Sequence, residues 1–107
     1  MIKIDLFIEF CKSLVGSRFK TAGGRAEFIL SSAQHSRLRY YVVSTGKIRD
    51  HTRRRIKMVL ARFGKTRSLR QADYKGISVN QPYILALISL YCSKHPLLVT
   101  GKLKRKS

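Results

Sequence analysis

An extended segment, a turn and a second extended segment follow one another in the sequence RLRYYVVSTGKIR, residues 37–49. Leu38–Ser44 is rich in Tyr and Val, residue types that favour β-strands, and its side chains alternate between two faces. Thr45-Gly46-Lys47 has the composition of a turn, after which a short strand through Ile48 and Arg49 can pair back. These residues predict an antiparallel hairpin.

Similar signals upstream extend the hairpin into a small antiparallel sheet. Residues 27–30 are a further strand candidate. Turn signals bound them at Gly23-Gly24 on one side and at residues 34–36 on the other.

Helical periodicity precedes the predicted sheet. Residues 5–16 place apolar side chains at helical spacing behind Asp5, a favoured N-cap residue, and Gly16 ends the pattern. This predicts a short amphipathic helix before the first strand.

Two helical segments follow the predicted sheet. Residues 52–63 start at Thr52, which can cap a helix, and carry apolar side chains at i, i+3, i+4 and i+7. Gly64 is expected to end this helix. Residues 68–74 predict a short second helix, which Gly76 ends.

A third helix is predicted from Asn80, its N-cap, to about Ser93, with Pro82 in the first turn. We therefore expect an α+β fold with an N-terminal helix, a small antiparallel β-sheet and a C-terminal helical (trihelical) unit. Residues 1–100 should form a single compact domain, and residues 101–107 a basic mobile tail.

The composition is that of a globular domain. Hydrophobic residues make up 44% and charged residues 26% of the 107 residues, which excludes wholesale disorder. The longest strongly apolar run, residues 82–92, is shorter than the ~20 residues that cross a bilayer, so no membrane span is expected. Cys11 and Cys92 lie in apolar helical patterns and are expected as free thiols in a reducing, cytoplasmic compartment.

The charge balance points to an anionic partner. The chain has 23 Lys and Arg against 5 Asp and Glu, a net charge of +18. Half of this excess lies in residues 47–75, and docking on a polyanion would relieve the repulsion. On the helix predicted at residues 52–63, one side is apolar and the other carries Arg54, Arg55, Lys57 and Arg62. Such a helix suits a nucleic-acid backbone first and an anionic membrane surface second.

The predicted strand at residues 38–44 offers a second basic surface. Alternation places Arg37, Arg39, Tyr41 and Val43 on one face and the core residues on the other. Cations beside an aromatic ring can hold phosphate and stack on an unpaired base. Alternatively, Tyr41 packs beneath the arginine stems of a neighbouring strand.

Residues 52–93 resemble the trihelical unit of helix-turn-helix DNA-binding domains. The resemblance rests on the spacing of four residues around a turn: Leu69, the small residue Ala72, the glycine four positions later at Gly76, and the apolar residue Ile77. It implies DNA rather than RNA as the partner. The sequence departs from the family at Pro82, which delays the next helix, and at residues 83–92, which are apolar on nearly every side. Asn80 and Gln81 are then the polar groups that can face a base or a phosphate.

These observations predict a nucleic-acid-associated binding protein, DNA favoured, and not an enzyme, with no cofactor and no metal. Phosphate contacts would supply most of the affinity. The predicted interface comprises Arg37, Arg39, Tyr41, Lys47, Arg49, Arg53, Arg54, Arg55, Lys57, Arg62, Lys65, Arg67, Arg70, Asn80 and Gln81.

Two other functions stay open. The protein could be an interaction module, an inhibitor or adaptor that lays its basic face on an acidic protein or a ribonucleoprotein. An exposed apolar side of residues 83–91, with Tyr83, Leu87, Leu90 and Tyr91, would indicate a protein partner or a homodimer. A small basic ribonuclease is the third option, with His51 or His35 as the base.

Overall fold

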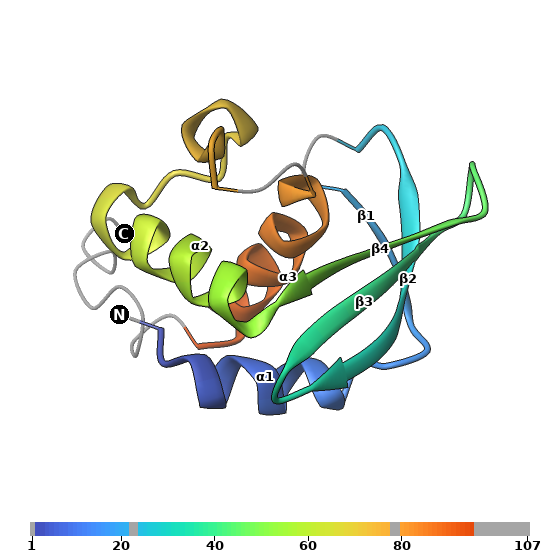
Figure 1. Cartoon of the computed structure of the whole chain (residues 1–107), viewed down its shortest axis with the longest axis horizontal. Helices are drawn as coiled ribbons and strands as arrows, with labels where there is room; N and C mark the ends of the chain where they lie inside the picture. Colours follow the sequence, from blue (N-terminus) through green and yellow to red (C-terminus); the bar gives the residue numbers. More distant parts are fainter. Residues whose placement is uncertain (1, 22–23, 78–79, 96–107) are drawn as a thin grey trace.

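The computed structural model describes residues 2–21, 24–77 and 80–95, and the predicted tail, residues 101–107, lies outside them. Within the described residues, the element order is α1, four β-strands, α2, a short 3-10 helix η1 and α3 (Figure 1). This is the predicted α+β architecture, an N-terminal helix and an antiparallel sheet followed by helices.

The strands form an antiparallel sheet in which each pairs with the next along the chain. The bounds are Arg18–Lys20 for β1, Glu27–Gln34 for β2, Arg37–Val42 for β3 and Lys47–Thr52 for β4. The predicted hairpin of residues 37–49 is confirmed as β3 and β4, although β3 ends at Val42 rather than at the predicted Ser44 and β4 continues past Arg49 to Thr52. Strand β1 was not predicted, since it has only three residues. Strand β2 continues past its predicted end at Leu30, because a register shift between Leu30 and Ser32 hides its alternation.

Strand β3 has the predicted alternation. Leu38, Tyr40 and Val42 are buried, whereas Arg39 and Tyr41 are exposed. Residues directly opposite each other in an antiparallel pair share a face. The register therefore places Phe28 and Leu30 of β2 beside the buried residues of β3.

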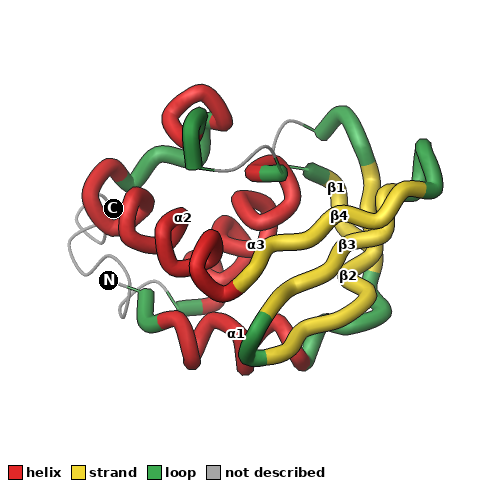
Figure 2. The backbone as a smooth tube through the Cα atoms, viewed as in Figure 1, coloured by secondary structure: helices red, strands yellow, loops and turns green. Residues whose placement is uncertain are grey.

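The helices cover only this buried face, and the opposite face of the sheet stays open (Figure 2). Helix α1 spans Ile4–Lys12, α2 spans Arg53–Thr66 and α3 spans Gln81–Lys94. Aromatic rings join the layers: Tyr40 of β3 stacks on Tyr83 of α3, with ring centroids 5.3 Å apart. The molecule thus has a helical layer and one sheet face without helices.

Helix α1 differs from its prediction at both ends. The predicted cap at Asp5 is wrong: the N-cap is Lys3, whose carbonyl accepts the Phe7 N–H. Asp5 lies in the first turn, and its carboxylate binds Arg53, so it is not available as a cap. The helix ends at Lys12, and Gly16, with φ of +93°, turns the chain toward β1.

Helix α2 begins where predicted, since the Thr52 hydroxyl accepts the Arg55 N–H. The predicted end at Gly64 is wrong, because the helix continues to Thr66 and ends at Arg67, which has a left-handed φ of 58°. A glycine inside a helix costs only about 1 kcal/mol. Burial of Phe63 and a hydrogen bond from Arg62 to the Asp73 carbonyl hold this turn.

The described C-terminal part contains two α-helices, with a short 3-10 helix in place of the second of the three predicted helices. Instead of a helix over residues 68–74, η1 is a four-residue 3-10 helix, Gln71–Tyr74. The Ser68 hydroxyl and the Tyr74 hydroxyl bind groups within this segment, and such local bonds compete with a helix. Helix α3 matches its prediction to within a residue, and its buried residues are Ile84, Leu85, Leu87, Ile88 and Tyr91.

Candidate nucleic-acid interface

Every Asp and Glu side chain lies within ion-pair distance of a basic side chain. The chain has five such residues, and the pairs are Asp5–Arg53 at 2.9 Å, Glu9–Lys12 at 2.9 Å, Glu27–Arg18 at 3.2 Å, Asp50–Arg37 at 3.1 Å and Asp73–Arg70 at 4.0 Å. The hydrogen bond from Arg53, and then its charge, lower the pKa of Asp5. With these carboxylates engaged, the net charge of +18 is balanced by solution ions or by a partner.

Three arginines of α2 hold the helix in place. Arg53 donates to Asp5 at 2.9 Å and to the His35 carbonyl at 3.1 Å, which ties α2 to α1 and to the β2–β3 turn. Arg55 donates to the Ile77 carbonyl and Arg62 to the Asp73 carbonyl, each at 2.6 Å. All three side chains were predicted to contact phosphate, but in the structure they bind other segments of the protein.

Three other cations of α2 point away from the core. Arg54, Lys57 and Lys65 are exposed, and no described side chain forms an ion pair with them. At 3.6 residues per turn they lie within about 80° of arc, opposite the buried side of α2. We call Arg54, Lys57 and Lys65 the helix surface. It is a cluster of positive charge in which no member forms an ion pair with a described carboxylate.

The remaining predicted cations are distributed around the molecule. Lys47 and Arg49 are exposed on the edge strand β4. Arg67 ends α2, with its guanidinium carbon 5.7 Å from the centre of the Phe63 ring. The Arg70 side chain is 80% exposed near Asp73. The sequence-predicted interface is therefore not one continuous surface.

The open face of the sheet carries a row of side chains, one from each strand. Arg18, Ile29, Tyr41 and Ile48 are paired in sequence across β1, β2, β3 and β4. We call this row, with Arg37 and Arg39 beside it, the sheet surface. The last two arginines lie 3.1 Å and 3.9 Å from Asp50. Sequence reasoning found Arg37, Arg39 and Tyr41 but missed the other three residues. Alternation along residues 47–52 could have placed Ile48 there, whereas β1 gave no usable signal.

Asn80 and Gln81 are engaged within the protein. The Asn80 amide donates to the Asp50 carbonyl of β4 at 3.1 Å, and the Gln81 amide lies 3.5 Å from the Gln71 carbonyl. Asn80 precedes α3 without capping it through its side chain. Both residues thus join the start of α3 to neighbouring segments.

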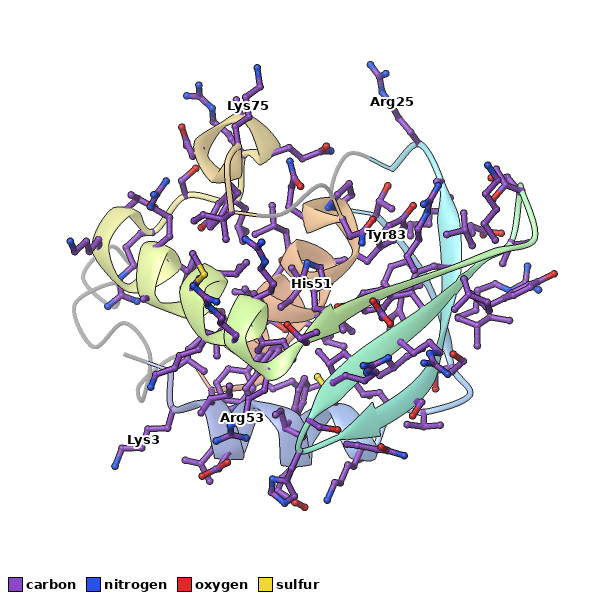
Figure 3. All side chains as sticks on the ribbon, viewed as in Figure 1. Lys3, Arg25, His51, Arg53, Lys75 and Tyr83 are labelled. Carbon is purple, nitrogen blue, oxygen red and sulfur yellow. The ribbon has the colours of Figure 1, made fainter. Side chains whose placement is uncertain are left out.

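His51 lies at the base of a cavity of about 380 Å³, between β4, the start of α2 and the chain before α3. It is only 2% exposed, and it shares a hydrogen bond of 2.8 Å with the Tyr40 hydroxyl. Figure 3 shows it in the interior, whereas Lys3, Arg25 and Lys75 point outward. Burial lowers its pKa to about 4, against an attraction from Asp50. At neutral pH it is a neutral core residue, and His35, the other suggested base, lies on the β2–β3 turn.

Features that would indicate a homodimer, a metal site or a membrane span are few in the part of the chain that the structure describes. Of the four residues named for a homodimer surface, Leu87 and Tyr91 are buried, whereas Tyr83 and Leu90 are half-buried, and a homodimer through residues 83–91 stays a prediction. Among the described residues, no group of three His, Cys, Asp or Glu side chains could hold a metal ion. In the same part of the chain, no helix is long and apolar enough to span a membrane.

The residues behind the helix-turn-helix resemblance are divided between surface and core. Leu69 is half-buried, Ala72 is exposed in η1, Gly76 has a φ of +86° and Ile77 is buried. Comparison with protein-family models, with curated proteins and with solved structures found no match to this chain. The preference for DNA that the resemblance implied stays a prediction.

Proposed function

We propose that the protein binds nucleic acid, with the helix surface contacting the phosphate backbone. One observation carries this proposal: each carboxylate side chain already has a basic partner, yet the chain retains a net charge of +18. A polymer of closely spaced phosphates balances such an excess and releases its condensed counterions on binding.

The two groups of α2 cations would have different roles, one in holding the helix and the other in binding phosphate. Arg53, Arg55 and Arg62 fix the helix against its neighbours through contacts of 2.6–3.1 Å. Arg54, Lys57 and Lys65 are left to contact phosphates, because they are exposed and lack a described acidic partner. Phosphate contacts of this kind set the position of a protein on the polymer and carry no sequence information. DNA is the first polymer to test, on the resemblance stated above.

The test compares two triple variants that lose the same charge. Arg54, Lys57 and Lys65 are replaced by alanine in one, and the exposed Lys3, Arg25 and Lys94 in the other. Affinity for a 20-base-pair DNA duplex is measured by fluorescence anisotropy over a salt series. At about 0.9 counterions per phosphate contact, the helix-surface variant should flatten the slope of log affinity against log salt by about 3. The control variant should change it by less than 1.

Equal effects of the two variants would overturn the site assignment, because the binding would then depend on net charge alone. Wild-type protein that binds neither DNA nor RNA at about 50 mM salt would overturn the function itself. An acidic protein or a ribonucleoprotein would then be the partner to seek.

A further inference from the structure

The sheet surface differs in chemistry from the helix surface. Tyr41 and Ile48, 38% and 54% exposed, are direct cross-strand neighbours on β3 and β4, and Ile29 lies on the other side of Tyr41. Exposed large apolar side chains elsewhere among the described residues lie on α1, on the turn after it or on α2. The sheet surface therefore presents apolar and aromatic groups side by side, where the helix surface presents charge.

Arginines border this apolar row. Arg18 lies opposite Ile29 at the β1 end and pairs with Glu27 at 3.2 Å. Arg39 precedes Tyr41 by two residues on the same face, and Asp50 holds it at 3.9 Å. With Arg37, the three arginines outnumber the two carboxylates near them. The face thus combines a modest positive charge with an aromatic ring, which fits a base flanked by phosphates better than a phosphate backbone alone.

We propose that the sheet surface binds a single-stranded segment of nucleic acid, with an unpaired base stacked on Tyr41. This inference rests on the proposed function and names the form of nucleic acid that the sheet surface binds. Paired bases in a duplex present only their edges in the grooves, so they cannot cover the tyrosine ring. An unpaired base has an accessible face, and stacking on an aromatic side chain tolerates any base. Arg39, two residues from Tyr41 along β3, and Arg18, beyond Ile29 in the row, are then the cations of this surface that can meet the flanking phosphates.

Two features make the sheet a suitable platform. Strands β2 and β4 support Tyr41 on both sides through direct pairing, so the ring stands on a rigid element rather than on a loop. Neighbouring strands are about 4.8 Å apart, so the row from Arg18 to Ile48 spans about 14 Å. Successive phosphates of one DNA strand are about 3.4 Å apart along the helix axis, so that length accommodates more than one nucleotide.

The experiment measures binding of a fluorescent dT12 oligonucleotide, which has no internal pairing, and of a 12-base-pair duplex. Tyr41→Ala should weaken dT12 binding about 5- to 150-fold, the range for loss of one stacked base, and leave duplex binding within about twofold. Tyr41→Phe keeps the ring and should bind dT12 within about twofold of wild type. Leu6→Ala removes an apolar side chain that is 54% exposed on α1, away from the sheet surface, and serves as the control.

A spectroscopic readout tests the contact directly. The chain contains no tryptophan, so Tyr41→Trp introduces a single indole on the sheet surface. Its fluorescence should be quenched by dT12 and unchanged by the duplex. Circular dichroism of each variant checks that the fold is retained.

Several results would overturn the inference. The inference is wrong if Tyr41→Ala binds dT12 as tightly as wild type, or if it loses the same affinity for dT12 and for the duplex. It is also wrong if Tyr41→Phe binds dT12 as weakly as Tyr41→Ala does. In each of these cases wild-type protein still binds, so the proposed function survives. Failure of wild-type protein to bind any polymer would overturn both, and the two failures are thereby distinguishable.

Discussion

Acidification should destabilise the protein through His51. The folded state keeps this imidazole buried and neutral, with a pKa of about 4, whereas the unfolded chain titrates near 6.5. Between these values the unfolded state binds more protons, so stability is complete above about pH 6.5 and falls as the pH falls toward 4. For these two pKa values, the linkage relation gives a loss of about 2 kcal/mol between pH 8 and pH 5.

The assay is urea unfolding followed by circular dichroism, at intervals from pH 8 to pH 5. Staying above pH 5 avoids the carboxyl of Asp5, whose pKa is lowered. The matched variant is His51→Gln, which does not titrate and retains His35 and His95. The difference in unfolding free energy between wild type and variant should shrink by about 2 kcal/mol over this range. A difference constant to within about 0.5 kcal/mol would refute the burial of a neutral His51.

Arg55→Ala and Arg62→Ala should each lower the free energy of unfolding by about 1 kcal/mol, because each side chain donates a 2.6 Å hydrogen bond to a backbone carbonyl. Lys57→Ala, measured in the same urea titrations, should change it by less than about 0.5 kcal/mol, and equal losses would contradict the division of α2 cations. Burial raises the pKa of the fully buried Cys11 thiol to about 12 and also raises that of the half-buried Cys92, so a thiol reagent at pH 8 should label Cys92 slowly and before Cys11 in the folded protein, and both cysteines rapidly in urea.

The parts of the fold that sequence predicts are those with strong periodicity. Strand β3 alternates Leu38, Tyr40 and Val42 with polar or exposed residues, and its buried face follows from that pattern alone. The buried stripe of α2 was predicted in the same way. Each of these two elements packs one side against the same hydrophobic core, so burial on that side alone determines its pattern of apolar residues.

The parts that sequence missed depend on contacts between distant residues. Asp5 has the chemistry of an N-cap, but Arg53, 48 positions away, takes its carboxylate. Gly64 has the chemistry of a helix end, but the contact of Arg62 with Asp73 holds the helix past it. Helix propensity depends on the residue and its near neighbours, so it does not include contacts with distant residues. In these two places the distant contact contributes more free energy than the local preference that it overrides.

The candidate interface was predicted mainly as a set of cations, together with Tyr41, Asn80 and Gln81, without regard to the contacts that each makes within the protein. The three residues of the helix surface, Arg54, Lys57 and Lys65, all belong to the basic region that the sequence analysis singled out. It could not separate these from Arg55 and Arg62, because exposed and engaged arginines occupy the same polar side of a helical wheel. Only the positions of the Asp73 and Ile77 carbonyls distinguish the two groups.

The order of the strands has a consequence for the timing of folding. Each strand pairs with its neighbour along the chain, so the sheet can form by closing short loops, which is fast. Helix α1 instead meets α3 through Phe10 and Tyr91, whose ring centroids are 5.1 Å apart across 81 positions of sequence. That contact closes almost the whole chain and carries the largest loop entropy. Refolding should therefore begin in the sheet and finish with the docking of the first helix on the last.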